Sequence, residues 1–216
     1  MHGVRVIDDC LPKEVQRRIE DMVVSLDFPL YRTPEHVTKD SLGHWGEDVK
    51  INGYTAKNSP QYVHKFFWDD EITSNYYQFI FPLLFSAFPF PITNVYRAKL
   101  NHVPKMCSDE YANTCGIPHC DAPPSDRISA IYYVNDSDGK TVIFNQTRQE
   151  GSSKVLTVDQ EIEPRQGRLV IFDVDRIHAS NVPLVSQHRT VINIVATPFL
   201  QKKGSLCAVT TKRAAQ

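Results

Sequence analysis

Three side chains in this sequence have the types and the order of a metal site. His119 and Asp121 stand two residues apart, so on an extended segment both point to one face and Cys120 points away. His178 follows 57 residues after Asp121, behind a segment that is typical of a β-strand. Two imidazoles and one carboxylate leave three positions of an octahedral ion open, an arrangement that suits non-haem iron(II). His119, Asp121 and His178 are therefore the predicted metal ligands.

A cation follows this group at an informative place. Arg189 comes eleven residues after His178 and opens an apolar, β-branched segment. A guanidinium inside a β-sheet fold is costly unless an anion partners it, and a bound dicarboxylate would be a bidentate partner. The alternative is that Arg189 lies at the exposed start of the strand, beside His188. The residues alone leave both interpretations open.

The second half of the chain has the pattern of a β-protein. Short apolar runs separated by turn residues predict strands near residues 93–103, 127–135, 141–145, 154–158, 168–173, 178–182 and 189–197. Asp138-Gly139 is a hairpin turn signal, because this pair tolerates positive φ angles. Many short strands joined by tight turns predict a β-sandwich or jelly roll and exclude an α/β fold.

The first half is predicted to support this β-structure. Apolar residues at helical spacing predict helices over 13–26 and 69–88, and Pro82 is expected to kink or shorten the second helix. A short strand is expected at 4–7 and an irregular loop at 29–60. We expect one domain over 1–216, with a helical N-terminal support region (1–92), a β-core (93–200) and a tail (201–216).

The order of the candidate residues resembles a known family. It is similar to the double-stranded β-helix oxygenases that use iron(II) and 2-oxoglutarate, and especially to their prolyl 4-hydroxylase-like members of small phage and bacterial type. The resemblance also includes three segments, namely Ala130-Ile131-Tyr132-Tyr133-Val134-Asn135, Asp138-Gly139-Lys140-Thr141-Val142-Ile143-Phe144 and the segment 164–173, which reads PRQGRLVIFD. It covers residues 93 to 200, about half of the chain.

This resemblance implies a fold and a set of cofactors. The implied fold is mostly β with N-terminal helices (α+β), a double-stranded β-helix of the jelly-roll or cupin-like kind. The implied cofactors are Fe(II), 2-oxoglutarate as co-substrate and dioxygen, with ascorbate as a further candidate. The implied catalytic set is His119, Asp121, His178 and Arg189, of which the first three hold the metal.

The same resemblance assigns the co-substrate pocket. Arg189 would bind the C5 carboxylate of 2-oxoglutarate, and the Tyr133 hydroxyl would reach the same group. Asn193 lies four residues after Arg189 on the same strand face, where a polar residue supports the cofactor. The sequence departs from animal prolyl hydroxylases on the strand before His119, where it has no clear tyrosine. Arg97, Lys99 and Asn101 stand there instead.

The implied activity is hydroxylation of an unactivated C–H bond, with a peptidyl proline as the leading substrate. The presence of Asp121 favours hydroxylation or oxidative demethylation over halogenation. The alternatives are an oxygenase acting on a small molecule or a nucleobase, and a non-enzymatic metal-binding jelly roll. Segment 105–116 is a candidate lid, and segments 29–60 and 147–154 are candidates to frame the mouth of the site. The candidate substrate contacts are Trp45, Tyr54, His102 and Arg127.

The composition of the chain predicts its cellular compartment and the kinds of partner it binds. The 216 residues carry a net charge of −1, which does not support a nucleic-acid partner, so a protein, peptide or small-molecule substrate is expected. Five cysteines without a Cys-x-x-Cys pair predict free thiols in a reducing compartment. No apolar run has the length of a membrane helix, and the start does not resemble a signal peptide. We expect a soluble cytoplasmic protein (in the host cytoplasm if viral) whose oligomeric state the sequence leaves open.

Overall fold

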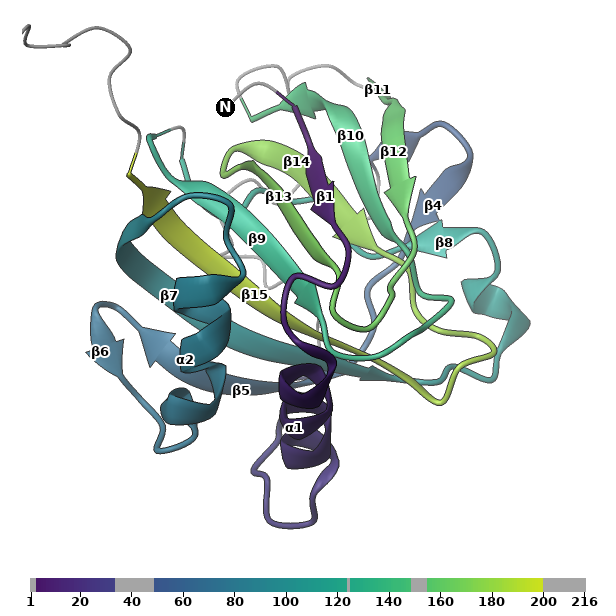
Figure 1. The fold of residues 1–216 in the computed structure, drawn as a ribbon. Helices are drawn as coiled ribbons and strands as arrows, with labels where there is room; N and C mark the ends of the chain where they lie inside the picture. The colour runs from purple at the N-terminus through teal and green to yellow at the C-terminus, as the bar shows by residue number, and fades with distance from the viewer. Residues whose placement is uncertain (1–2, 34–48, 124, 149–154, 200–216) are drawn as a thin grey trace, which may run out of the picture.

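The computed structural model describes residues 3–33, 49–123, 125–148 and 155–199 (Figure 1). Its largest layer is an eight-stranded sheet in which the neighbours run β1-β13-β9-β15-β7-β5-β2, with β6 paired to β5. These strands are β1 (Arg5–Ile7), β2 (Tyr31–Thr33), β5 (Gln61–Trp68), β6 (Glu71–Ile72), β7 (Ile92–Pro104), β9 (Ile128–Tyr133), β13 (Leu169–Asp173) and β15 (His188–Pro198). All of their pairings are antiparallel.

Two smaller sheets complete the β-structure. One has the order β12-β10-β14 and consists of β10 (Thr141–Thr147), β12 (Val158–Ile162) and β14 (Arg176–Ser180). The other has the order β11-β3-β4-β8 and consists of β3 (Lys50–Ile51), β4 (Tyr54–Ala56), β8 (Thr114–Cys115) and β11 (Val155–Leu156). The described chain is mostly β, and the predicted jelly roll with few helices is confirmed.

Two α-helices pack on the outer face of the large sheet (Figure 1). Helix α1 (Lys13–Val24) buries Ile19, Met22 and Val23, and helix α2 (Tyr77–Ser86) buries Ile80, Leu83 and Leu84. They meet the fully buried Leu100, Ile192 and Ile194 of the sheet, and burial of each such side chain stabilises the fold by roughly 1.5–3 kcal/mol. A 3-10 helix, η1 (Asp109–Tyr111), precedes β8.

The other face of the large sheet meets the β12-β10-β14 sheet. Ile131, Tyr133, Val170 and Val191 of the large sheet form one buried cluster with Ile143 and Ile162 of the smaller sheet. Because residues two apart along a strand share a face, the other inward positions of β7 and β15 include Arg97, Lys99, Asn101, Arg189 and Asn193. Polar and charged residues therefore point toward the space between the two sheets.

The N-terminal region contains more strand than its sequence predicted. Besides the two helices, β1 and β2 form the two edges of the large sheet, and β5 adds an inner strand. The predicted helix over 69–88 was too long at its start. Asp69 and Asp70 adopt positive φ angles in a tight turn that leads into β6, so the helix begins only at Tyr77. Pro82 lies inside this short helix.

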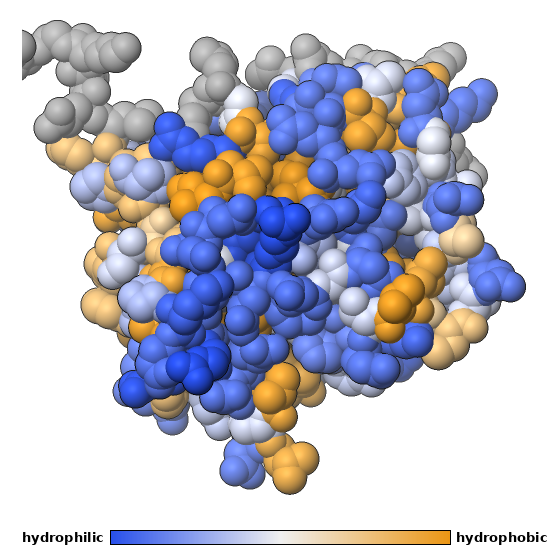
Figure 2. Space-filling view, turned by 45° about the vertical axis from the view of Figure 1, so that its right-hand side comes forward, coloured by the Kyte–Doolittle hydropathy of each residue, from blue (hydrophilic) through white to orange (hydrophobic). Residues whose placement is uncertain are grey.

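The surface seen in Figure 2 is mainly hydrophilic, with hydrophobic residues gathered in separate patches. The large exposed hydrophobic residues include Leu26 after α1 and Phe79, Phe81 and Phe85 on α2. No helix within the described ranges is both long and apolar enough to cross a membrane.

Candidate metal centre

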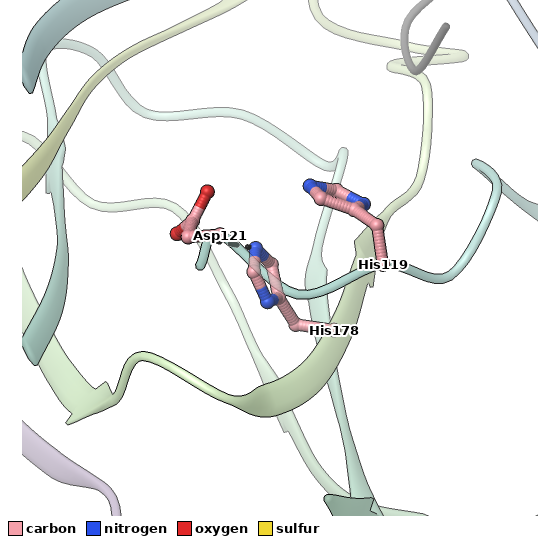
Figure 3. Close-up of side chains that lie close together, drawn as sticks. All are labelled: His119, Asp121 and His178. Carbon is pink, nitrogen blue, oxygen red and sulfur yellow. Dashed lines mark ion pairs between the residues drawn. The ribbon is translucent and has the colours of Figure 1, made fainter. Parts of the chain in front are cut away.

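The structure brings His119, Asp121 and His178 together. Each offers one ligand atom, and these atoms lie within 4.8 Å of one another (Figure 3). Backbone pairing explains this proximity, because the amide of His119 donates to the carbonyl of His178 and the reverse bond also forms, each at 3.0 Å. The segment before Asp121 is thereby tied to β14, and the two imidazole rings lie 4.5 Å apart between centroids.

The two imidazoles are oriented for coordination by one nitrogen each. Nδ1 of His119 lies 3.0 Å from the Ile117 carbonyl oxygen, and Nδ1 of His178 lies 3.1 Å from that of Arg176. A carbonyl oxygen only accepts hydrogen bonds, so Nδ1 carries the N–H that donates and Nε2 keeps its lone pair. Nε2 of His178 lies 3.7 Å from Oδ2 of Asp121, which leaves these two groups facing the same point (Figure 3).

Three side chains fix the carboxylate of Asp121. The Ser129 hydroxyl donates to Oδ2 at 2.6 Å, and the Asn193 amide donates to the same oxygen at 3.2 Å. The Arg97 guanidinium forms an ion pair with Oδ1. Burial alone would raise the pKa of Asp121, but Arg97 and the two histidines hold it well below its usual range. The carboxylate is therefore ionised at neutral pH, as a metal ligand must be.

His119 is also in the protonation state that a metal requires. Burial lowers its pKa to about 3, and the neighbouring His178 acts in the same direction. The ring is neutral at neutral pH, so no proton competes for Nε2. The Nε2 atoms of the two histidines and the fixed carboxylate of Asp121 form a donor set that fits iron(II).

Arg189 lies at the buried end of the same space. Only 2% of the residue is exposed, which rules out the exposed strand-start alternative. Its Nε donates to the Gly139 carbonyl at 2.7 Å, and Nη2 donates to the Thr141 hydroxyl oxygen at 2.8 Å. The Tyr133 hydroxyl also donates to that oxygen, at 2.6 Å. Among the described residues no carboxylate pairs with Arg189. This buried cation can therefore pair with the carboxylate of a bound ligand.

The spacing of the two groups fits 2-oxoglutarate. On the paired strands β10 and β14, Ile143 lies opposite His178 and Thr141 lies opposite Ser180. Thr141, which contacts Arg189, is thus two strand residues from the position opposite His178, a step of about 7 Å. A five-carbon dicarboxylate has the length to bridge this step. Burial raises the pKa of Tyr133, which keeps its hydroxyl protonated and able to donate.

The other predicted site residues that the structure describes do not act as ligands of the triad. Asn193 faces the site but contacts Asp121 and Arg97. Tyr54 donates to Glu161 on β12 at 2.6 Å, and Arg127 stacks on the Tyr96 ring at 3.6 Å. The His102 ring bonds Thr190 on the helix-covered face of the sheet, away from the triad. Trp45 lies outside the described residues, as do the rest of 34–48 within segment 29–60 and residues 149–154 within segment 147–154.

From the sequence, no role was assigned to three residues that complete this arrangement. Thr141 lies in the family-like segment 138–144, but only the fold shows that its hydroxyl joins Tyr133 to Arg189. Ser129 and Arg97 bond the Asp121 carboxylate from β9 and β7. Alternation along β7 and β9 puts both side chains on the inner face of the sheet. Which partner they meet there depends on the strand register, which the sequence does not give.

Comparisons with known proteins agree with this geometry. Residues 109–195 match the sequence profile of the 2OG-Fe(II) oxygenase superfamily. A 2OG-Fe(II) oxygenase family oxidoreductase from Burkholderia pseudomallei has a TM-score of 0.60 at 14% identity, over 90% of this chain and 85% of that one. The epimerase SnoN from nogalamycin biosynthesis gives 0.56 at 11% identity, over 91% and 78%. A Pseudomonas putida prolyl-4-hydroxylase gives 0.51 at 15% identity, over 91% and 94%.

No curated protein matches the sequence. At these identities the solved structures establish the fold, a jelly roll of the oxygenase type. The predicted resemblance is confirmed: the chain carries the fold and the core sequence pattern of the 2OG-Fe(II) oxygenase superfamily, which uses Fe(II), 2-oxoglutarate and dioxygen.

Proposed function

We propose that this protein is an iron(II)- and 2-oxoglutarate-dependent oxygenase that hydroxylates an unactivated C–H bond. His119, Asp121 and His178 hold the iron, and Arg189 holds the distal carboxylate of 2-oxoglutarate. The observation that carries the proposal is the buried, carboxylate-free guanidinium of Arg189 beside a two-histidine, one-carboxylate cluster. A metal-binding jelly roll without a co-substrate would have no use for that cation, which is costly to bury.

Bound iron and 2-oxoglutarate would supply the oxidising chemistry, and the protein's own residues position them. Thr141 and Tyr133 orient the guanidinium of Arg189 and add hydroxyl groups beside it. Ser129 and Asn193 hold Oδ2 of Asp121 and Arg97 holds Oδ1, so the carboxylate would meet the metal in one orientation. The apolar cluster of Ile131, Ile143 and Val191 excludes water from the inner end of the pocket.

The oxygenase class does not by itself determine the substrate. The predicted peptidyl proline rests on the similarity of segments 130–135, 138–144 and 164–173 to prolyl hydroxylases. The fold is shared both with a prolyl-4-hydroxylase and with an epimerase from nogalamycin biosynthesis, and a shared fold does not imply a shared substrate. The small-molecule alternative therefore stands beside the peptidyl one.

The test is an anaerobic titration of 2-oxoglutarate into the iron(II)-loaded protein, followed by the visible charge-transfer band of the chelate. We expect the band in the wild type. In Arg189→Gln it should require about 10- to 100-fold more 2-oxoglutarate, because charge-assisted bonds are lost. Iron bound without any band, or an unchanged titration in Arg189→Gln, would contradict the proposal. Lys13→Gln on α1 serves as a matched control far from the site.

A further inference from the structure

A group of basic side chains lies beside the metal centre and has no part in the chemistry described above. Lys65 of β5, Lys99 of β7 and Asn193 of β15 stand directly opposite one another in the sheet register. Residues opposite each other point to the same face, and Asn193 bonds the ligand Asp121. Lys65 and Lys99 therefore extend the inner face outward from the metal ligands.

A β-bulge adds an aromatic ring to this row. The pairing of β5 with β7 shifts between Lys65 and Phe67, so that Trp68 lies opposite Arg97. Residues three apart on a regular strand point to opposite faces, but the extra residue turns Trp68 to the face of Lys65. The Lys65 ammonium lies 4.1 Å from the centre of the Trp68 ring, which agrees with that placement. We call Lys65, Trp68 and Lys99 the basic ledge.

Neither lysine of the ledge forms an ion pair within the described parts of the chain, although the Asp121 carboxylate acts electrostatically on Lys99. Arg97 is paired with Asp121, whereas Lys65 and Lys99 form neither an ion pair nor a hydrogen bond there. Asp69, Asp70 and Glu71 follow Trp68 in the turn and in β6 and pair with neither lysine. Lys99 is half-buried, and burial with the nearby Arg97 lowers its pKa to about 8. A bound anion would offset this cost of keeping the ammonium charged.

The cofactors of the proposed function would not neutralise the ledge. Two negative charges on 2-oxoglutarate and one on Asp121 would match the two on iron and the one on Arg189. The positive charges of Arg97, Lys65 and Lys99 would then remain on the same face of the large sheet.

We propose that the basic ledge binds an anionic group, a carboxylate or a phosphate, of a small acidic substrate. This inference rests on the proposed function and favours its small-molecule alternative over an internal peptidyl proline. The strand register places Lys99 opposite Asn193, which bonds Asp121, so the anionic group and the reacting C–H bond belong to the same small molecule. The bulge that turns Trp68 inward gives one wall for an apolar part of it.

The test uses the fluorescence of Trp68 as a local probe. The chain has two tryptophans, so Trp45→Phe leaves Trp68 as the only indole. The full chain is loaded with zinc(II) and N-oxalylglycine, an inert analogue of 2-oxoglutarate, and quenched with iodide or with neutral acrylamide. We expect iodide to quench about threefold more strongly than in the Lys65→Gln/Lys99→Met protein at low salt, with acrylamide unchanged between them. Lys13→Gln is the matched control.

Competitors identify the anionic group. Benzoate and phenyl phosphate should relieve iodide quenching, and benzamide should not. The anion that competes more strongly with iodide shows whether the ledge prefers a carboxylate or a phosphate. Equal iodide quenching with and without the two lysines, or equal competition by benzamide, would overturn the proposal. So would loss of the iodide effect on loading with N-oxalylglycine, because the ledge would then belong to the co-substrate. Lys65→Gln alone, at an exposed position, guards against misfolding of the double variant.

These outcomes are separable from those of the proposed function. The charge-transfer titration reports on iron and 2-oxoglutarate, whereas the quenching experiment uses neither iron nor turnover. A normal charge-transfer band with no iodide preference leaves the oxygenase assignment standing and removes only the ledge. An iodide preference without the band would keep the anion site and remove the oxygenase.

Discussion

The guanidinium of Arg97 forms an ion pair with Asp121, and its Nη2 also donates to Oδ1 of Asn193 at 2.7 Å. One basic side chain on β7 thus joins a predicted metal ligand to the strand that carries Arg189. The same contact is a main cause of the depressed pKa of Asp121.

Loss of this ion pair should move the acid limit of metal binding. The metal needs the ionised form of Asp121, and the depressed pKa preserves that form as the pH falls. In Arg97→Met the pKa of Asp121 rises, so affinity for zinc(II) should decline at a higher pH than in the wild type. Equilibrium binding measured from pH 4 to pH 8 checks this, with Arg17→Met on α1 as the control. Superimposable pH profiles would refute it.

The three ligands should act as a unit in metal binding. His119→Ala, Asp121→Ala and His178→Ala should each abolish stoichiometric iron(II) binding, measured by metal analysis after dialysis. His102→Ala removes a histidine from the helix-covered face of the sheet and should leave the stoichiometry intact. Full iron content in any of the three ligand variants would exclude that residue from the centre.

Gly139 should be required for the position of Arg189. A Cβ atom at residue 139 would lie 2.9 Å from Cδ of Arg189 and 2.8 Å from the Asn181 carbonyl oxygen. Gly139→Ala should therefore displace the guanidinium and weaken 2-oxoglutarate about tenfold, while iron binding is unchanged. Anaerobic titrations of both ligands measure this. An unaltered 2-oxoglutarate affinity would mean that the guanidinium does not hold the co-substrate.

Thr141 should serve both stability and co-substrate binding. Thr141→Val keeps the shape but leaves the Tyr133 hydroxyl and one guanidinium nitrogen without their common acceptor. Each unsatisfied buried group costs about 1–3 kcal/mol, so the melting temperature should fall together with 2-oxoglutarate affinity. Thr141→Ser keeps the hydroxyl and should recover most of both. A serine variant as impaired as the valine variant would point to packing and not to the hydroxyl.

Asp138 should stabilise the fold only above acidic pH. Its carboxylate accepts backbone bonds from Leu184, Val185 and Ser186 at 2.8, 3.0 and 2.8 Å, and these bonds overcome burial to lower its pKa to about 2. A depressed pKa contributes stability that is present above the unfolded value and is lost as pH falls through the folded value.

The matching experiment is urea unfolding of the wild type and Asp138→Asn. At pH 7 the variant should be less stable by about 1 kcal/mol, a modest figure because the carboxylate is exposed. At pH 2.5 the difference should shrink, because the wild-type carboxylate becomes increasingly protonated. An equal difference at both pH values would attribute the effect to shape and not to charge.

Strand pattern and motif order predicted the β-core well. Strands expected at 93–103, 168–173 and 189–197 are observed as Ile92–Pro104, Leu169–Asp173 and His188–Pro198. Long apolar, β-branched runs bounded by turn residues carry their own signal. The N-terminal strands β2, β3, β4 and β6 have two or three residues each, too few for any periodicity to appear.

The site was predictable only in part. His119, Asp121, His178 and Arg189 carry recognisable chemistry in a recognisable order. The partners of Asp121 do not, because Arg97 and Ser129 lie 24 and 8 residues away and meet it only through strand register. Lys65 and Trp68 share a face because of a bulge, a local irregularity that alternation rules cannot anticipate.

The placement of β1, β2 and β5 has a consequence for shortened versions of the chain. These N-terminal strands cover both flanks of the large sheet, so a fragment starting at residue 93 would leave the thirteen-residue β7 with an unpaired side. Open strand edges recruit other chains, and the apolar face normally under α1 and α2 would be bare as well. We expect such a fragment to self-associate, even though it holds every predicted metal ligand.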